Sequence, residues 1–269
     1  MDKLIITVAA NGESRRKKDN PHIPITVEEV ADDIFACYEA GASIAHLHGR
    51  DPVTEDINWE PGYYCKVAEG IRDRCDVILN FSTGGVTEDP YERLQSFSSK
   101  PEMCSLSGGS VNFTGNAFVN HPDVIWEFAR RAHENGIKPN IEVFDYSHTV
   151  WAKRIADSEI YNGPLSVDIL MSKPGNVRFT PRHLLFYVEA LPEGTLWHTI
   201  ADGWDQLHMA TMAIIMGGHV RVGIEDNNEY VPGKISTNVE QVERIVRLAR
   251  ELGREVATPS EAREMLGLG

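Results

Sequence analysis

The sequence predicts a single-domain (β/α)8 TIM barrel, and three observations support this prediction. Strand-like and helix-like segments alternate along the chain, eight of them are strand-like, and the 269 residues are close to the typical length of about 250 residues for this fold. A doubly wound parallel sheet shares the alternation and is the main alternative. Eight repeats without a linker or a low-complexity tract favour one barrel domain over residues 1–269, with a short C-terminal helix.

Short apolar runs predict the eight strands, and amphipathic patterns predict the helices between them. The strands span residues 4–11, 43–50, 77–82, 103–108, 139–144, 167–172, 196–201 and 219–225. The helices span residues 26–40, 61–74, 122–135, 181–190, 206–216 and 238–252, with weaker patterns at 91–97 and 150–160. Thr26 is the expected N-cap of the clearest helix, which Gly41 ends. A capping-box pattern predicts the last short helix, at residues 258–266.

The composition argues against several classes of function. With 40 acidic and 26 basic residues the formal net charge is −14, and such a surface repels nucleic acids and anionic lipid headgroups. No apolar run approaches the roughly 20 residues of a transmembrane helix, and the first residues are typical of a strand rather than a secretion signal. The four cysteines form no C-x-x-C pair, as expected for reduced thiols. We therefore expect a cytoplasmic enzyme acting on small molecules.

Two histidines in the second strand are candidate metal ligands. His46 and His48 alternate with Leu47, so both imidazoles should face the inside of the barrel. Such a pair can bind a metal, or it can simply form hydrogen bonds within the barrel. The last strand favours the metal, because its alternation places Arg221 and Glu225 inward, with Glu225 at the C-terminal rim where catalytic groups of barrels lie. Two histidines and one glutamate leave a coordination position open, as a catalytic zinc ion requires.

Hydroxyl groups at the ends of the third and fourth strands predict an anion pocket at the same rim. Ser82 and Ser107 should face inward, and each leads into a glycine-rich turn, the first of which contains Thr83 and Gly85. Backbone N–H groups of such turns can bind an anion such as a carboxylate. Either motif alone is most often only a turn, but two of them beside a metal site favour the pocket.

Alternation along the remaining strands places two more polar residues. Glu142 should face inward, where a buried carboxylate is costly unless it is used in catalysis or paired, for example with Arg50. His198 shares the face of Leu196 and Ile200, so we expect it to face the helices.

Four segments together resemble the β-keto acid cleavage enzyme family over essentially the whole chain. They are HLHGRD at residues 46–51, NFSTGG at 80–85, NIEVFD at 140–145 and GGHVRVGIEDN at 217–227. The resemblance implies a zinc-bearing barrel, usually a homotetramer, that exchanges acyl groups between a β-keto acid and acetyl-CoA, yielding acetoacetate and a new acyl-CoA. It also implies a role for each matching residue: His46, His48 and Glu225 bind zinc, Arg221 and Asp226 form the base dyad, Ser82 and Ser107 hold the substrate carboxylate, and Glu13 and Glu142 line the substrate pocket.

The sequence departs from the family pattern in two places. Ser107 stands where the family often has threonine, a change that keeps the hydroxyl group. Residues 200–206 read IADGWDQ, whereas many members carry an IGRHQ-like segment after the seventh strand. Because the arginine of that segment is missing, we expect this side of the pocket to differ in shape and charge.

The negative charge of Glu13 indicates the chemical class of the substrate. It follows the first strand at the catalytic rim, and a carboxylate there should repel a dicarboxylate and attract an ammonium group. We therefore expect 3-keto-5-aminohexanoate or a related amino β-keto acid as substrate; the alternative is that Glu13 pairs with Arg15 or Arg16. The basic run 15–18 is predicted to attract the phosphates of CoA, and a solvated loop is the alternative.

Three other classes of protein are alternatives to this interpretation. A metal-dependent aldolase shares the polarised ketone and the carbanion, but it forms no CoA ester. An amidohydrolase-like zinc hydrolase also starts from H-x-H on a barrel strand, but it needs further inward histidines and often a carboxylated lysine, which the fifth and sixth strands do not offer. A non-catalytic metal-binding barrel has no reason to place Glu13, Arg221 and Asp226 at the rim.

Overall fold

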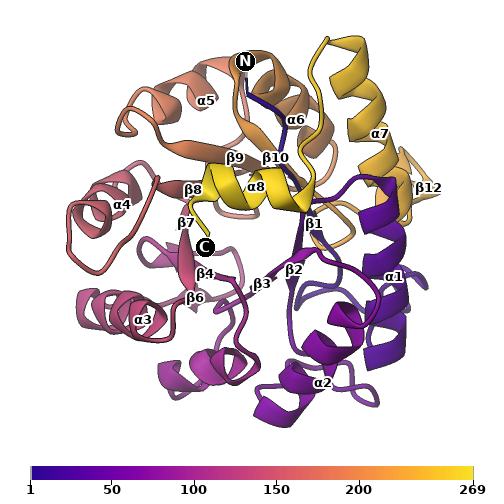
Figure 1. The fold of residues 1–269 in the computed structure, drawn as a ribbon, viewed down its shortest axis with the longest axis horizontal. Helices are drawn as coiled ribbons and strands as arrows, with labels where there is room; N and C mark the ends of the chain where they lie inside the picture. Colours follow the sequence, from indigo (N-terminus) through magenta and orange to yellow (C-terminus); the bar gives the residue numbers. More distant parts are fainter. Residues whose placement is uncertain (1, 269) are drawn as a thin grey trace.

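The computed structural model describes residues 2–268, and its centre is a closed barrel of eight parallel strands (Figure 1). Each strand overlaps one of the eight predicted segments, so the predicted barrel is confirmed. In order around the barrel the strands are β1 (Ile6–Ala9), β2 (Ile44–Leu47), β3 (Ile78–Phe81), β4 (Met103–Ser107), β7 (Lys138–Val143), β8 (Ser166–Met171), β9 (Leu196–Ala201) and β10 (His219–Val222), which pairs with β1.

Helices connect consecutive strands and cover the outside of the barrel. They are α1 (Val27–Ala40), α2 (Pro61–Arg72), the 3-10 helix η1 (Pro90–Ser99), α3 (Pro122–Glu134), α4 (His148–Ala156), α5 (Pro181–Val188), α6 (Asp205–Met216) and α7 (Asn238–Glu251). The predicted cap of α1 forms, since the Glu29 N–H donates to the Thr26 hydroxyl and the Glu29 carboxylate accepts from the Thr26 N–H. Among the described residues, no helix has both the length and the apolar character needed to cross a membrane.

Two short hairpins were not predicted. They are β5 (Val111–Asn112) with β6 (Ala117–Phe118), after β4, and β11 (Glu229–Val231) with β12 (Lys234–Ile235), after β10. Strands of two or three residues are too short for the alternation that identifies a strand in sequence. Both hairpins belong to loops at the C-terminal ends of barrel strands.

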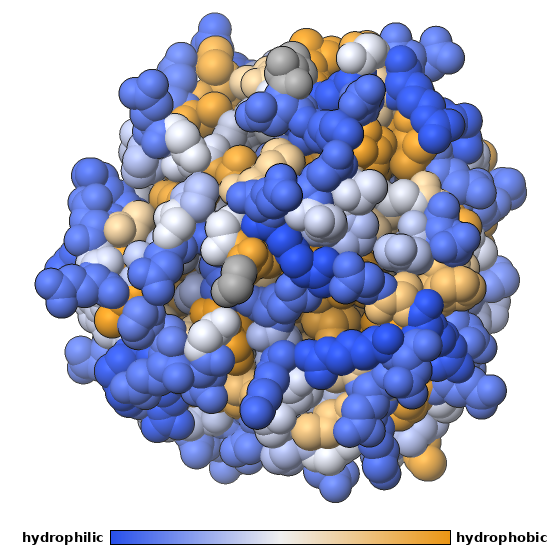
Figure 2. Space-filling model, viewed as in Figure 1, coloured by the Kyte–Doolittle hydropathy of each residue, from blue (hydrophilic) through white to orange (hydrophobic). Residues whose placement is uncertain are grey.

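The C-terminal helix α8 (Pro259–Leu266) closes the N-terminal end of the barrel (Figure 1). Its Ala262 and Leu266 pack on the first inward side chains of the strands, such as Ile5 and Ile44. On the face that α8 covers, hydrophilic side chains surround scattered apolar ones (Figure 2). A site of the size of a substrate must therefore lie at the other end of the barrel, where the strands end.

His198 faces the inside of the barrel, so the prediction that it faces the helices is wrong. Its Nδ1 lies 3.5 Å from Asp168 Oδ1, and its ring lies against that of His219. Trp197 of the same strand packs with the helices instead. The prediction assumed that Leu196 and Ile200 face the helices because they are apolar. Both instead pack in apolar clusters at the two ends of the barrel interior.

Substitution of Gly223, which directly follows β10, is expected to lower the stability of the protein measurably. Its φ is +140°, and a Cβ there would overlap the carbonyl oxygen of Ala9 in β1. Gly223→Ala should therefore cost about 3 kcal/mol or more, from left-handed strain together with overpacking. Gly217→Ala is the matched control, since Gly217 has φ +88° and open space around it; it should cost only about 1–2 kcal/mol. Urea unfolding compares the two, and equal losses would contradict the proposed clash.

Candidate active site

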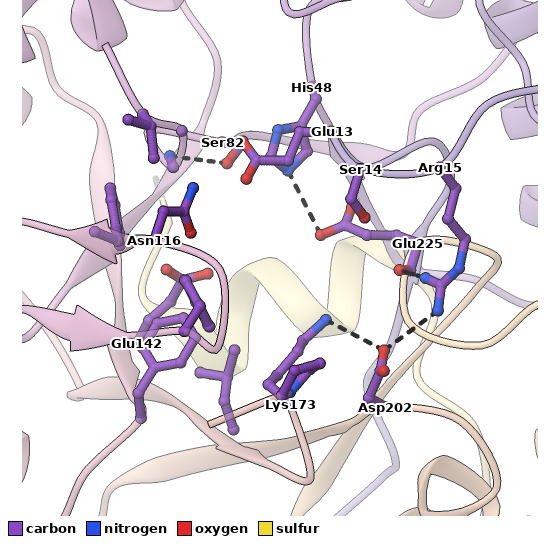
Figure 3. Close-up of a pocket in the computed structure, with 18 of the residues that line it drawn as sticks. Glu13, Ser14, Arg15, His48, Ser82, Asn116, Glu142, Lys173, Asp202 and Glu225 are labelled. Carbon is purple, nitrogen blue, oxygen red and sulfur yellow. Dashed lines mark hydrogen bonds and ion pairs between the residues drawn. The ribbon is translucent and has the colours of Figure 1, made fainter. Parts of the chain in front are cut away.

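A cavity of about 490 Å³ opens at the C-terminal ends of the barrel strands. This is within the size range of pockets that bind small molecules. Charged and polar side chains from opposite sides of the barrel converge on it (Figure 3): Glu13, His48, Ser82, Glu142, Lys173, Asp202 and Glu225. Arg221 also lines it.

The three predicted metal ligands lie together at one side of this cavity, with His48 and Glu225 in its wall and His46 buried beside them. Glu225 Oε1 lies 3.5 Å from His48 Nε2 and 3.8 Å from His46 Nε2. One ligand atom from each residue can be chosen so that all three lie within 4.8 Å of one another. The second carboxylate oxygen of Glu225 is buried and has no hydrogen-bond partner among the described residues, as expected of an oxygen that can bind a cation.

The segment around the end of β1 holds these ligands in place. Ala9 pairs with His46 of β2, and its carbonyl accepts a hydrogen bond of 3.3 Å from the Glu225 N–H. The Asn11 side chain forms two hydrogen bonds, of 3.0 and 3.1 Å, with the backbone of His48. Gly12 leaves the space that Glu225 fills, since a Cβ at Gly12 would lie 2.6 Å from Glu225 Cγ.

Protonation states in the cluster suit a divalent cation. Burial, together with the nearby Arg221 guanidinium, lowers the pKa of His46 to about 3, so its imidazole is neutral at pH 7. Burial alone would raise the pKa of Glu225, but Arg221 and the two histidines hold it well below its usual range. Neutral imidazole and ionised carboxylate are the forms that bind metals, so these residues fit zinc.

The predicted dyad of Arg221 and Asp226 forms, and a lysine joins it. Arg221 Nε donates to Asp226 Oδ2 at 2.9 Å, and Lys173 Nζ donates to Asp226 Oδ1 at 2.6 Å. Burial acts to raise the pKa of Asp226, but the two cations hold it below its usual value. Arg221 and Lys173 line the cavity, whereas the fully buried Asp226 lies behind them. The carboxylate therefore reaches the cavity only if Lys173 moves.

Four of the predicted substrate-binding residues line the cavity: Glu13, Ser82, Gly85 and Glu142. The other two do not. Thr83 ties β3 to β4 through its N–H and hydroxyl, which bond to Ser105 at 3.0 and 2.7 Å. The Ser107 hydroxyl donates to the carbonyl of Gly109 at 2.9 Å and so stabilises its own turn.

Glu13 and Glu142 do not form the ion pairs with arginine that were the alternatives to a role in the substrate pocket. Glu13 Oε2 is buried without a hydrogen-bond partner among residues 2–268, and Arg15 and Arg16 pair elsewhere. Arg50 donates to backbone carbonyls rather than to Glu142. Burial raises the pKa of Glu142 to about 7. Both carboxyl groups are therefore available to a ligand.

A family model described as beta-keto acid cleavage enzyme matches residues 3–268. The chain belongs to this family. The family predicted from the four sequence segments is thus confirmed. The chain is 44% identical to the 3-keto-5-aminohexanoate cleavage enzyme of Acetoanaerobium sticklandii, over 100% of this chain and 99% of that protein. It is 37% identical to the 3-oxoadipate:acetyl-CoA acetyltransferase of Cupriavidus necator, over 98% of this chain and 94% of that protein.

The barrel also resembles solved structures. The apo structure of ObcA superimposes with a TM-score of 0.79 and 20% identity, over 93% of this chain and 66% of the ObcA chain. At this identity the likeness concerns the fold alone.

The basic run 15–18 is folded onto the barrel, unlike the free cationic patch predicted for the phosphates of CoA. Arg15 donates to the backbone carbonyls of residues 224–226 and to Asp202. Arg16 pairs with Asp56 at 2.5 Å, and Lys17 pairs with Glu29. These contacts pair three of the four residues with other groups of the protein and favour the alternative of a loop.

Sequence reasoning missed Lys173, Asp202 and Asn116, which also line the cavity. Lys173 and Asp202 directly follow the predicted strands 167–172 and 196–201, so their place at the catalytic rim was a usable signal. Asn116 lies between the two unpredicted strands β5 and β6, and no pattern of the sequence points to it. Asp202 belongs to the segment that departs from the family pattern.

Proposed function

We propose that this protein is a zinc-dependent β-keto acid cleavage enzyme that condenses an amino β-keto acid, such as 3-keto-5-aminohexanoate, with acetyl-CoA. The products are acetoacetate and a new acyl-CoA. One observation carries this proposal: His48 and Glu225 of the metal trio line the same cavity as Glu13, whose Oε2 has no hydrogen-bond partner among residues 2–268. The relatives named for 3-keto-5-aminohexanoate and for acetyl-CoA support the substrates.

The cavity offers a separate group to each part of such a substrate. Ser82 lines the cavity and its hydroxyl can donate to the carboxylate, while the N–H of Gly84 holds the Ser82 oxygen in place at 3.0 Å. Glu13 faces the same space and accepts from the ammonium group in a charge-assisted hydrogen bond. Zinc bound by the trio would polarise the ketone, which lies between the carboxylate and the ammonium group of the substrate, and would acidify the C2 hydrogens.

Asp226 is the base in this proposal, with Arg221 as the residue that orients it. When Lys173 releases one oxygen of Asp226, that oxygen can accept the C2 proton. The C2 carbanion attacks the thioester carbonyl of acetyl-CoA and forms a carbon–carbon bond, and CoA transfers to the former ketone carbon. Cleavage of the bond between C2 and that carbon then releases acetoacetate, so no covalent enzyme nucleophile is needed.

Incubation with 3-keto-5-aminohexanoate and acetyl-CoA tests this reaction. Mass spectrometry should detect both acetoacetate and the new acyl-CoA. A metal-dependent aldolase would consume the keto acid without forming a thioester, which would overturn the proposal.

Glu13→Gln should change substrate preference rather than catalysis in general. The wild-type protein should favour 3-keto-5-aminohexanoate over 3-oxohexanoate in kcat/KM, and the variant should lose about tenfold or more of this ratio, the scale of a hydrogen bond to a charged group. The uncharged 3-oxohexanoate is the internal control, since its kcat/KM should change little. An unchanged ratio in the variant would remove Glu13 from substrate recognition.

A further inference from the structure

A side groove adjoins the active-site cavity between the loops that follow β8 and β9. Its volume is about 330 Å³, and its wall includes Lys173, Asn176 and Arg178 from the first loop and Asp202, Trp204 and Asp205 from the second. Lys173 and Asp202 line both the cavity and the groove, so the two spaces meet at these side chains. In Figure 3 they lie across the cavity from Glu13 and Ser82.

Hydrogen bonds at Ser172 build the groove in advance of any ligand. Ser172 has φ +61°, a left-handed conformation that costs energy in a residue with a side chain. Its N–H donates to the carbonyl of Val177 at 2.8 Å, and its hydroxyl donates to Asp205 Oδ2 at 2.7 Å. These bonds tie the two loops together and set the direction of Lys173, the next residue, at the junction with the cavity.

Trp204 gives this groove an unused donor. Its indole Nε1 is buried and has no hydrogen-bond partner among the described residues. A buried N–H group without an acceptor is costly, so the atom is suited to a carbonyl oxygen of a ligand. Asp202, whose ion pairs with Arg15 and Lys173 use Oδ1, adds its Oδ2 as an acceptor for an amide N–H group. The groove therefore suits a chain that contains amide bonds.

The outer part of the groove carries an accessible cation. The Arg178 side chain is 84% exposed, and its Nε lies 3.7 Å from Asp205 Oδ2. On a protein with a formal net charge of −14, a cation at the mouth of a groove is a favourable place for a phosphate.

The topology of the barrel places this groove on the side where the second substrate must enter. Glu13, His48 and Ser82, three of the groups assigned to the keto acid, follow β1, β2 and β3, and β8 and β9 lie opposite β2 and β3 in the order of the strands. A further hollow, of about 260 Å³, adjoins the cavity on the keto-acid side, at Gly85 and Phe118. A thioester that enters from the side groove therefore presents its carbonyl to the C2 carbanion from across the cavity.

We propose that the side groove binds the pantetheine arm of acetyl-CoA, with the Trp204 N–H donating to an amide carbonyl and Arg178 facing the diphosphate. This inference rests on the proposed function, because it takes acetyl-CoA as the second substrate. It assigns a role to the segment 200–206, whose sequence departs from the family pattern.

Two variants and two thioesters test the groove. Arg178→Ser should raise KM for acetyl-CoA about fivefold, the scale of an exposed charge pair, with kcat within about twofold of wild type. The same variant should leave KM unchanged for acetyl-pantetheine, which lacks the diphosphate. Trp204→Phe keeps an aromatic ring but removes the N–H, and it should raise KM about fivefold for both thioesters.

Arg182→Ser is the matched control. Arg182 is an exposed residue of α5 that does not line the groove, and its removal changes the net charge by the same amount. An equal rise of KM in this control would show a general charge effect and overturn the inference, as would unchanged KM values in both groove variants. Because Arg178 is exposed, its variant should fold normally even if Trp204→Phe does not. Failure of the proposed function gives a different result, since wild-type protein would then form no acyl-CoA.

Discussion

His46→Ala is expected to bind zinc more than about a hundredfold more weakly than the wild-type protein and to lose its turnover. Loss of a group that only supports a ligand already costs about 10–100-fold in metal affinity, so loss of a ligand itself should cost more. His48→Ala should have the same effect. Since the His48 side chain reaches the cavity wall, its removal disturbs the barrel interior less than removal of His46. Zinc content after dialysis and activity after addition of zinc measure both properties.

His133→Ala provides the control for these variants, because His133 is an exposed residue of α3 outside the cavity. It should keep the zinc content and the turnover of the wild type. Undiminished zinc in both His46→Ala and His48→Ala would reject the metal site. If the variants lose zinc but keep their turnover, His46 and His48 bind the metal, and the metal has a structural rather than a catalytic role.

The clustering of His46, His48 and Glu225 could be predicted, because alternation along a strand decides which side chains face the inside of the barrel. His46 and His48 lie on a strand, and Glu225 follows one closely enough to keep its parity, so a period of two residues sufficed to place all three at one rim. The same argument failed for His198. It assumed that apolar neighbours face the helices, whereas the ends of the barrel interior are apolar as well.

Direction alone could not predict what each side chain bonds to. Ser107 was predicted from its strand to bind substrate, yet its hydroxyl is used by the carbonyl of Gly109. Arg15 is only two residues from Glu13 in the sequence, yet its guanidinium donates to backbone carbonyls of Ile224 and Asp226, after β10. Such choices depend on loops, which have no periodicity. The hairpin with Asn116 and the ion pair between Lys173 and Asp226 could be seen only in the folded chain.

Asp226→Asn should lower turnover by about 10²-fold or more, the usual scale for the loss of a general base. The amide has the shape of the carboxylate and can still accept hydrogen bonds from Arg221 and Lys173, but it cannot accept a proton. Zinc content and keto-acid binding should therefore stay close to those of the wild type. The low pKa of the paired Asp226 also means that its basicity rises only when Lys173 releases it, so Lys173 belongs to the same step.

Hydrogen exchange at C2 separates a base from a residue that only positions Arg221. In D2O without acetyl-CoA, wild-type protein should accelerate exchange of the C2 hydrogens of the keto acid, and Asp226→Asn should not. Glu142→Gln is the informative comparison, because burial raises the pKa of Glu142 to about 7 and its carboxyl group lines the cavity. We expect this variant to keep the exchange and to bind the keto acid more weakly. If Asp226→Asn exchanges at the wild-type rate while Glu142→Gln does not, Glu142 is the base, and Asp226 serves to hold the two cations beside the cavity.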